Sequence, residues 1–128
     1  MKKIHAFRKT IVWVVFMLVL FLIPSQSIPG SQEMPYVDKI VHTVFFMVFT
    51  ILLIFERLRY RHLKSVGTGY ALIVFLIVLG FAVMVECLQV IMNLGREGDI
   101  MDILFDLVGY VLGLFIVIFL TATSSRPL

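Results

Sequence analysis

The sequence predicts an all-α, small polytopic membrane protein with four transmembrane helices. Of its 128 residues, 61% are hydrophobic and only 15% are charged. The mean hydropathy is +1.07, and such values lie outside the range of soluble globular domains. The apolar residues fall into four blocks, separated by stretches that contain proline, glycine or charge. Four spans in a single domain of residues 1–128 are therefore the natural expectation.

The four helices are expected at residues 7–24, 38–56, 69–92 and 101–121. A hydrocarbon core about 30 Å thick needs roughly 20 helical residues, and the second and fourth blocks reach this length easily with their flanks. The first block follows a basic stretch and ends at Pro24, as the apolar region of a signal peptide would. No small-residue cleavage site follows it, and Arg8 and Lys9 can extend their side chains to the lipid surface. An uncleaved first helix is favoured.

The basic residues predict the orientation. If the N-terminus is cytoplasmic, all but two of the 11 lysines and arginines lie on the inner side, the exceptions being Lys39 and Arg96. This satisfies the positive-inside rule and places both termini in the cytoplasm. The pI of about 9.2 then reflects topology and contact with anionic inner-leaflet lipid. It gives no support for a nucleic-acid partner.

The acidic residues are distributed in the opposite sense, since all but Glu56 of the 8 fall on the outer side. Acidic residues contribute little to topology, so this asymmetry needs another cause. An ionised carboxylate that faces lipid costs at least a few kcal/mol, so these groups should face one another or a water-filled cavity.

Three of the expected helices carry a polar stripe near the outer end. Residues three or four positions apart share one face of a helix. The stripes therefore predict a shared polar pocket at the outer ends of the second, third and fourth helices. They consist of Asp38 and His42, of Glu86 and Gln89, and of Asp102 and Asp106.

The start of the fourth helix has two further features. Gly109 and Gly113 form a G-x-x-x-G pattern on the face that carries the acids, which permits close approach of a neighbouring helix. Asp99 and Asp102 lie where the helix should begin, and its macrodipole favours negative charge there. Capping of this helix by Asp99 or Asp102 is therefore an alternative to a functional role.

Four short motifs in order along the chain resemble those of the VanZ-like family. They are D-K-x-x-H at 38–42, E-x-x-Q at 86–89, R-x-x-D-x-x-D at 96–102 and G-x-x-x-G at 109–113. The resemblance runs from about Asp38 to Leu120. One departure is Asp106, because family members commonly carry asparagine at the matching position.

The resemblance implies a bacterial cell-membrane protein. The founding relative lowers susceptibility to teicoplanin, a lipoglycopeptide that acts outside the cell on peptidoglycan precursors. Many relatives occur without a glycopeptide-resistance cluster, so a housekeeping role in envelope lipid or polymer metabolism is an equal expectation. The expected partners are membrane lipids, with a lipid-linked cell-wall precursor or a lipoglycopeptide as further candidates.

The first functional hypothesis is acid–base catalysis, either hydrolysis or group transfer, on an outer-leaflet lipid head group or a lipid-linked cell-wall intermediate. Burial and neighbouring charges can drive the pKa values of clustered carboxylates, histidine and lysine apart. One group then holds a proton while another does not, as acid–base chemistry requires. Glu86 or Asp102 would act as the base, with His42 accepting or donating a proton. The expected catalytic group is Glu86, Asp102, His42 and Asp99, and the expected substrate-binding group is Arg96, Lys39, Asp38, Gln89 and Asp106.

Two other classes of function stay open. The same groups could bind a lipid or cell-wall precursor without turnover, or they could pair as salt bridges that hold a structural scaffold together, although buried ion pairs are a poor source of stability. A divalent metal on His42, Glu86, Asp99 and Asp102 is a further alternative. No compact metal-binding motif supports it, so no metal ligand is assigned from the sequence.

Overall fold

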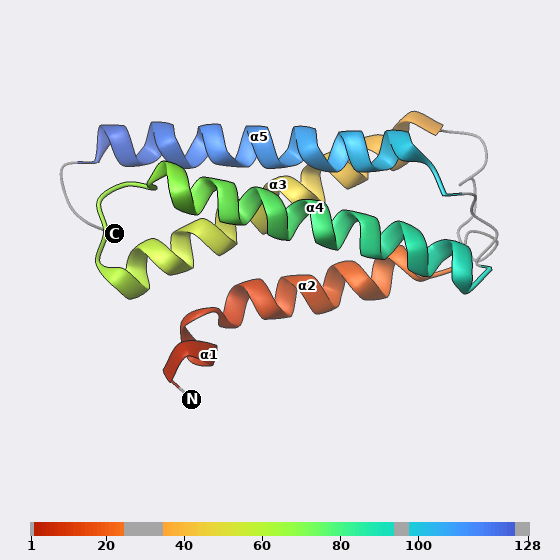
Figure 1. The fold of residues 1–128 in the computed structure, drawn as a ribbon, viewed down its shortest axis with the longest axis horizontal. Coiled ribbons are helices and arrows are strands. Elements are labelled where there is room, and N and C mark those ends of the chain that lie inside the picture. Colours follow the sequence, from red (N-terminus) through yellow and green to blue (C-terminus); the bar gives the residue numbers. More distant parts are fainter. Residues whose placement is uncertain (1, 25–34, 94–97, 125–128) are drawn as a thin grey trace.

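The computed structural model describes residues 2–24, 35–93 and 98–124, and all regular elements among these residues are helices. A short helix, α1 (Lys2–Ala6), leads into α2 (Arg8–Phe21), and α3 (Pro35–Arg61), α4 (Thr68–Ile91) and α5 (Ile100–Thr123) follow. Helices α2 to α5 run alternately up and down a single bundle, so that α2 begins and α5 ends at the same end (Figure 1).

Three of these helices are long and apolar enough to cross a membrane: α3 from Tyr36, α4 and α5, with 26, 24 and 24 residues. Helix α2 has 14 residues. At about 1.5 Å per residue it is about 21 Å long, which is short of a hydrocarbon core of about 30 Å. The sequence prediction of four transmembrane helices is therefore wrong for the first one, and the described residues contain three candidate spans.

The first helix is shorter than predicted because the chain leaves helical geometry at both ends. Phe7 separates α1 from α2, with φ −107° and ψ 24°. Helix α2 stops at Phe21, three residues before Pro24, whereas the prediction extended it to residue 24. In contrast, α3 extends beyond the predicted 38–56 at both ends.

Helix α2 nevertheless packs against the bundle. The indole Nε1 of Trp13 donates a hydrogen bond to the Phe45 carbonyl at 3.1 Å, and the Gln89 amide donates to the Phe21 carbonyl at 2.9 Å. At the other end of α2, the Glu56 carboxylate accepts hydrogen bonds from the backbone N–H groups of Lys9 and Thr10 and from the Thr10 hydroxyl, at 2.7 to 3.0 Å.

The closest helix contact joins α3 and α5 through the two predicted glycines. A Cβ atom on Gly109 would lie 2.9 Å from the Met47 backbone nitrogen, and one on Gly113 would lie 2.7 Å from the Met47 carbonyl oxygen. Such distances are far below van der Waals contact, so only glycine lets the backbones approach this closely. This contact fixes the face of α5 that carries Asp102 and Asp106 against α3.

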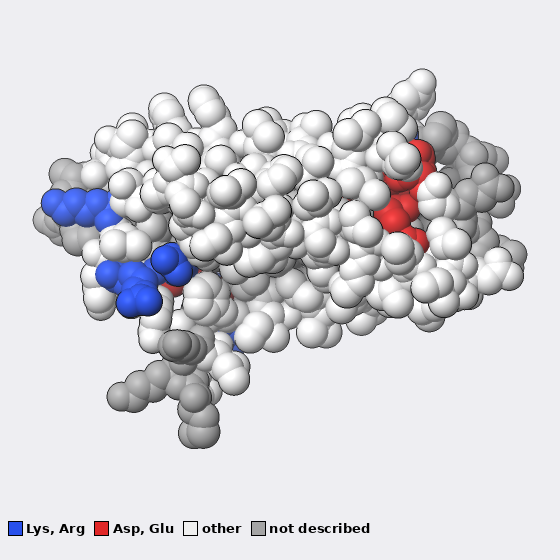
Figure 2. All heavy atoms as spheres, viewed as in Figure 1, with Lys and Arg blue, Asp and Glu red and all other residues white. Residues whose placement is uncertain are grey.

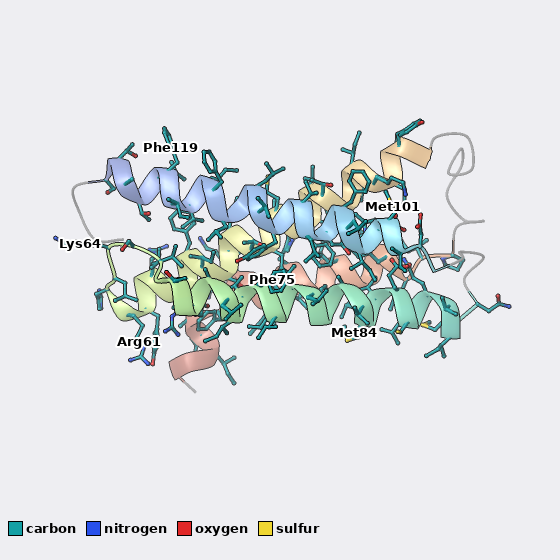
Figure 3. All side chains as sticks on the ribbon, turned by 45° about the horizontal axis from the view of Figure 1, so that its top comes forward. Arg61, Lys64, Phe75, Met84, Met101 and Phe119 are labelled. Carbon is teal, nitrogen blue, oxygen red and sulfur yellow. The ribbon has the colours of Figure 1, made fainter. Side chains whose placement is uncertain are left out.

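The sides of the bundle, between its two ends, expose mainly apolar residues. Phe115, Phe119, Val111 and Leu76 are all more than half exposed, and Met84 and Phe119 project away from the bundle (Figure 3). Figure 2 shows that this apolar band separates lysine and arginine side chains at one end from acidic side chains at the other. We call these the basic end, which holds Arg57, Arg59, Arg61 and Lys64, and the acidic end, which holds the first turns of α5.

Candidate functional site

The polar stripes of three helices meet at the acidic end. Helix α3 contributes Lys39 and His42 from its second and third turns, and α4 contributes Glu86 and Gln89 from its last turns. Helix α5 contributes acidic residues from its N-cap and first two turns. Because α3 and α5 enter from this end and α4 leaves there, their polar segments share one depth (Figure 1).

The centre of the site is a buried pair of His42 and Asp106. The imidazole Nδ1 lies 2.8 Å from the Asp106 Oδ1, and both side chains have no exposed surface. An ionised carboxylate can only accept a hydrogen bond, so with Asp106 ionised the proton in this contact lies on Nδ1. A neutral imidazole then presents a lone pair at Nε2. That atom is buried, makes no hydrogen bond to any described residue, and lies 3.9 Å from the Asp102 Oδ2.

Helix α2 forms one wall of this pair. The Phe21 ring stacks on the His42 imidazole with a centroid separation of 4.5 Å and an interplanar angle of 29°. The Phe21 carbonyl accepts the hydrogen bond from Gln89. Sequence reasoning did not find Phe21, because an apolar residue in an apolar helix carries no signal of its partner. It also placed Gln89 with the substrate, whereas one of its donors is already engaged within the bundle.

Lys39 connects the two outermost acids of α5. Its Nζ lies 3.1 Å from the Asp99 Oδ2 and 3.3 Å from the Asp102 Oδ1. The lysine side chain is one-fifth exposed and that of Asp99 nearly half, so this ion pair lies at the rim of the site. The second oxygen of Asp102 is directed to the His42 side.

Asp99 is the N-cap of α5, as one of the sequence alternatives proposed. Its Oδ1 accepts a hydrogen bond from the Met101 backbone N–H at 2.8 Å. That hydrogen bond, and after it the one from the Lys39 ammonium, hold the pKa of Asp99 below its ordinary value of 3.8. Asp99 therefore has a structural role, and it stays ionised at neutral pH.

Glu86 joins α4 to the start of α5. Its Oε2 accepts a hydrogen bond from the Asp99 backbone N–H at 3.1 Å. Its Oε1 is buried and has no hydrogen-bond partner among the described residues. Gly98 permits this approach, because a Cβ atom there would lie 2.9 Å from the Val90 Cγ2.

A cavity of about 300 Å³ opens beside Glu86, between the ends of α4 and α5. Glu86 and Asp99 supply its carboxylates, and the remaining walls are mainly apolar, from Cys87, Val90, Ile91, Gly98, Ile100 and Ile103. Ile91 and Ile100 are three-quarters exposed or more on the outer surface of the bundle. The cavity therefore adjoins the face that would contact lipid.

The structure brings together eight of the nine residues that the sequence analysis assigned to the site. Arg96 lies outside the described residues. Among the rest, the ligand atoms of Asp38, His42 and Asp102 lie within 4.8 Å of one another, a grouping that could hold a metal ion. This set differs from the metal alternative drawn from the sequence, because Asp38 takes the place of Glu86 and Asp99.

The comparisons with known proteins give one result. The VanZ/LLP1 family model matches residues 2–121, nearly the whole chain. No curated protein and no solved structure matches the chain. The chain therefore belongs to the VanZ/LLP1 family of membrane proteins, as the four sequence motifs indicated.

Proposed function

We propose that this VanZ/LLP1 family member catalyses hydrolysis or group transfer on a lipid head group, or on a lipid-linked cell-wall intermediate, at the outer face of the bacterial membrane. The observation that carries the proposal is the environment of Glu86. One of its oxygens is held by the Asp99 N–H, whereas the other is buried and unpartnered among the described residues, and the residue lines a mainly apolar cavity.

Glu86 is the general base in this proposal. A carboxylate with one fixed and one free oxygen is oriented and still able to accept a proton. The free Oε1 removes a proton from water or from a second substrate's hydroxyl group. The oxygen that loses the proton forms the new bond to the ester phosphorus or carbon as the bond to the leaving oxygen breaks. The proton held by Glu86 then passes to the leaving oxygen.

The remaining polar groups bind and orient the substrate. Among the described residues, Lys39 is the one lysine or arginine at the acidic end. Its ammonium can hold a substrate phosphate or a developing oxyanion. The His42–Asp106 pair and Asp102 form the inner wall of the polar site. The cavity beside Glu86 suits the apolar portion of a lipid that enters from the side.

The orientation follows from the charge at the two ends. The basic end holds Arg57, Arg59 and Arg61 at the end of α3 and Lys64 in the loop that follows, and such clusters stay in the cytoplasm. The acidic end, with Glu86 and its cavity, then faces outward. The start of α2 and the end of α5 both lie at the basic end (Figure 1), so the proposed orientation has both termini on the cytoplasmic side.

Lipid mass spectrometry tests the proposal. Cells would express the intact protein, Glu86→Gln, or the matched control Glu56→Gln, which changes the same residue type at the opposite end. The intact protein and the control should produce a new or depleted head-group species, and Glu86→Gln should not. Equal membrane amounts of the three proteins would be checked by immunoblot. A lipid profile that Glu86→Gln leaves the same as the intact protein's would contradict the proposal.

The same experiment separates catalysis from binding. If lipid chemistry is unchanged in every strain but a lipid co-purifies with the intact protein and is lost with Glu86→Gln, the protein is a binder. If neither differs, the polar groups are a structural scaffold. Teicoplanin susceptibility of the same strains would show whether the activity bears on that antibiotic.

A further inference from the structure

We infer that Asp38, His42 and Asp102 bind one divalent transition-metal cation, of the Mn²⁺ or Zn²⁺ class, through the His42 Nε2 and one oxygen of each carboxylate. This inference deepens the proposed function and rests on it for the purpose of the ion. Two of the three ligands come from α3 and the third comes from α5.

His42 has the features of a metal ligand. It has no exposed surface, and its Nε2 has no hydrogen-bond partner among the described residues. A buried polar atom without a partner has lost its hydration and gained no hydrogen bond in return, so a ligand at this atom would be stabilising. Its Nδ1 lies 2.8 Å from the Asp106 Oδ1, within hydrogen-bond distance. A carboxylate on the other ring nitrogen is the usual means by which proteins fix the tautomer and raise the basicity of a metal-binding histidine.

The two carboxylates are positioned to complete the set. Asp102 gives one oxygen to Lys39, whereas its Oδ2 faces the His42 Nε2 at 3.9 Å. Asp38 lies one helical turn before His42 on α3, and so on the same face. All three ligand atoms lie within 4.8 Å of one another. In tetrahedral coordination, with each ligand about 2.1 Å from the ion, two ligand atoms lie about 3.4 Å apart, so the side chains would have to close by up to about 1.4 Å when the ion binds.

The charge at the acidic end also favours a cation. Among the described residues, five carboxylates gather there, and Lys39 is the one lysine or arginine side chain beside them. Excess negative charge at the edge of a hydrocarbon layer is unfavourable, and a bound dication would offset it. The carboxylates are Asp38, Glu86, Asp99, Asp102 and Asp106.

The ligand types indicate the class of ion. One imidazole nitrogen with two carboxylate oxygens suits Mn²⁺ or Zn²⁺ better than Ca²⁺ or Mg²⁺, which prefer oxygen alone. Three protein ligands leave a coordination position for water or for a substrate oxygen, as in catalytic rather than structural metal sites. The ion would thus bind the phosphate or carbonyl oxygen of the substrate whose reaction Glu86 assists.

Metal uptake by the purified protein tests this inference. The protein in detergent would be treated with a chelator, dialysed against Mn²⁺ or Zn²⁺, and its bound metal measured by elemental analysis. One ion per chain is expected, and pulsed electron paramagnetic resonance of the Mn²⁺ form should show coupling to an imidazole ¹⁴N nucleus. His42→Gln and Asp102→Asn should lose the ion. Asp106→Asn should weaken binding by roughly 10- to 100-fold, as loss of a ligand-orienting group does.

The control is Glu56→Gln, which should bind the ion as the intact protein does. Helical circular dichroism and gel filtration would show that each variant is folded. If the buried variants fail to fold, Asp38→Asn, on the half-buried first turn of α3, provides the same test. Failure of the intact protein to retain either metal, retention that His42→Gln or Asp102→Asn leaves unchanged, or a signal without ¹⁴N coupling would each overturn the inference.

The two proposals can fail separately. If no metal binds but Glu86→Gln still removes the change in lipid composition, the metal site is wrong and the proposed function stands. If the metal binds with the expected dependence on His42 and Asp102 but lipids are unchanged in every strain, the proposed catalysis is wrong and the metal site stands.

Discussion

Glu56 at the basic end and Glu86 at the acidic end are both glutamates on membrane helices, and each accepts a hydrogen bond from a backbone N–H outside its own helix. Glu56 uses its two oxygens for three hydrogen bonds to the first turn of α2. Glu86 uses one oxygen for the Asp99 N–H, and the other is buried without a partner among the described residues. A carboxylate whose two oxygens both accept hydrogen bonds anchors a helix, whereas a carboxylate with one unpartnered oxygen can still accept a proton.

The same contrast extends to the surroundings of each residue. Two cavities adjoin Glu56: one is lined mainly by basic and polar side chains, among them His5 and Arg8, and the other by Leu52 and Phe55, and both include the cations of Lys9 and Arg59. The cavity at Glu86 is mainly apolar and adjoins the exposed outer surface of α4 and α5. The cations around Glu56 suit contact with lipid phosphates at the membrane surface, whereas the cavity at Glu86, with no lysine or arginine in its lining, suits the apolar part of a lipid.

The largest expected effect would break the acidic end. Asp106→Ala removes the partner of a fully buried histidine, and loss of one member of a buried pair costs on the order of 3 kcal/mol. Asp106→Asn keeps an oxygen that accepts the Nδ1 hydrogen bond, so it should cost much less. Thermal unfolding in detergent would compare the two variants. Equal stability of the alanine and asparagine variants would show that the His42–Asp106 pair does not hold this end together.

A smaller effect is expected at the basic end. Glu56→Ala removes the carboxylate that caps α2, and loss of a helix cap costs about 1–2 kcal/mol. Hydrogen exchange at the Lys9 and Thr10 amides should become faster, whereas exchange at Asp99, whose N–H is bound by Glu86, should not change. Faster exchange at Asp99 in this variant would show that the two ends are not independent.

The smallest effect is a pH dependence at the rim. The pKa of Asp99 is lowered in the folded state, so its ionised form stabilises the fold at pH values above its unfolded value of 3.8. This contribution is lost as the pH falls through the lower folded pKa. The effect is small because the Asp99 side chain is nearly half exposed. Asp99→Asn keeps the cap but cannot ionise, so its unfolding temperature should fall less than that of the intact protein between about pH 5 and about pH 3.

Much of the acidic end could be predicted from the sequence, because hydropathy and helical spacing are local properties. The apolar blocks gave the helices α3, α4 and α5, and the four-residue spacing placed Asp38 and His42 on one face. The Gly109 and Gly113 contact followed from the G-x-x-x-G pattern, since small residues are needed wherever two backbones meet.

The rest depends on contacts between distant residues. The hydrogen bond from Thr10 to Glu56 joins residues 46 positions apart, and nothing in the sequence near either residue indicates its partner. The stacking of Phe21 on His42 has the same character. The grouping of Asp38, rather than Glu86, with His42 and Asp102 depends on how each helix is rotated, which spacing along one helix does not determine. The length of α2 depends on where its ends leave helical geometry, and hydropathy does not report this.

The most direct test of the account is which side of the membrane the acidic end faces. The exposed Cys87 would first be changed to serine. A single cysteine would then replace either Met92, just after the end of α4, or Lys64, in the loop between α3 and α4 at the basic end. Whole cells would be treated with a membrane-impermeant maleimide before and after permeabilisation. We predict labelling of position 92 in intact cells and of position 64 only after permeabilisation. Labelling of position 64 but not position 92 in intact cells would place Glu86 and its cavity in the cytoplasm and contradict the account.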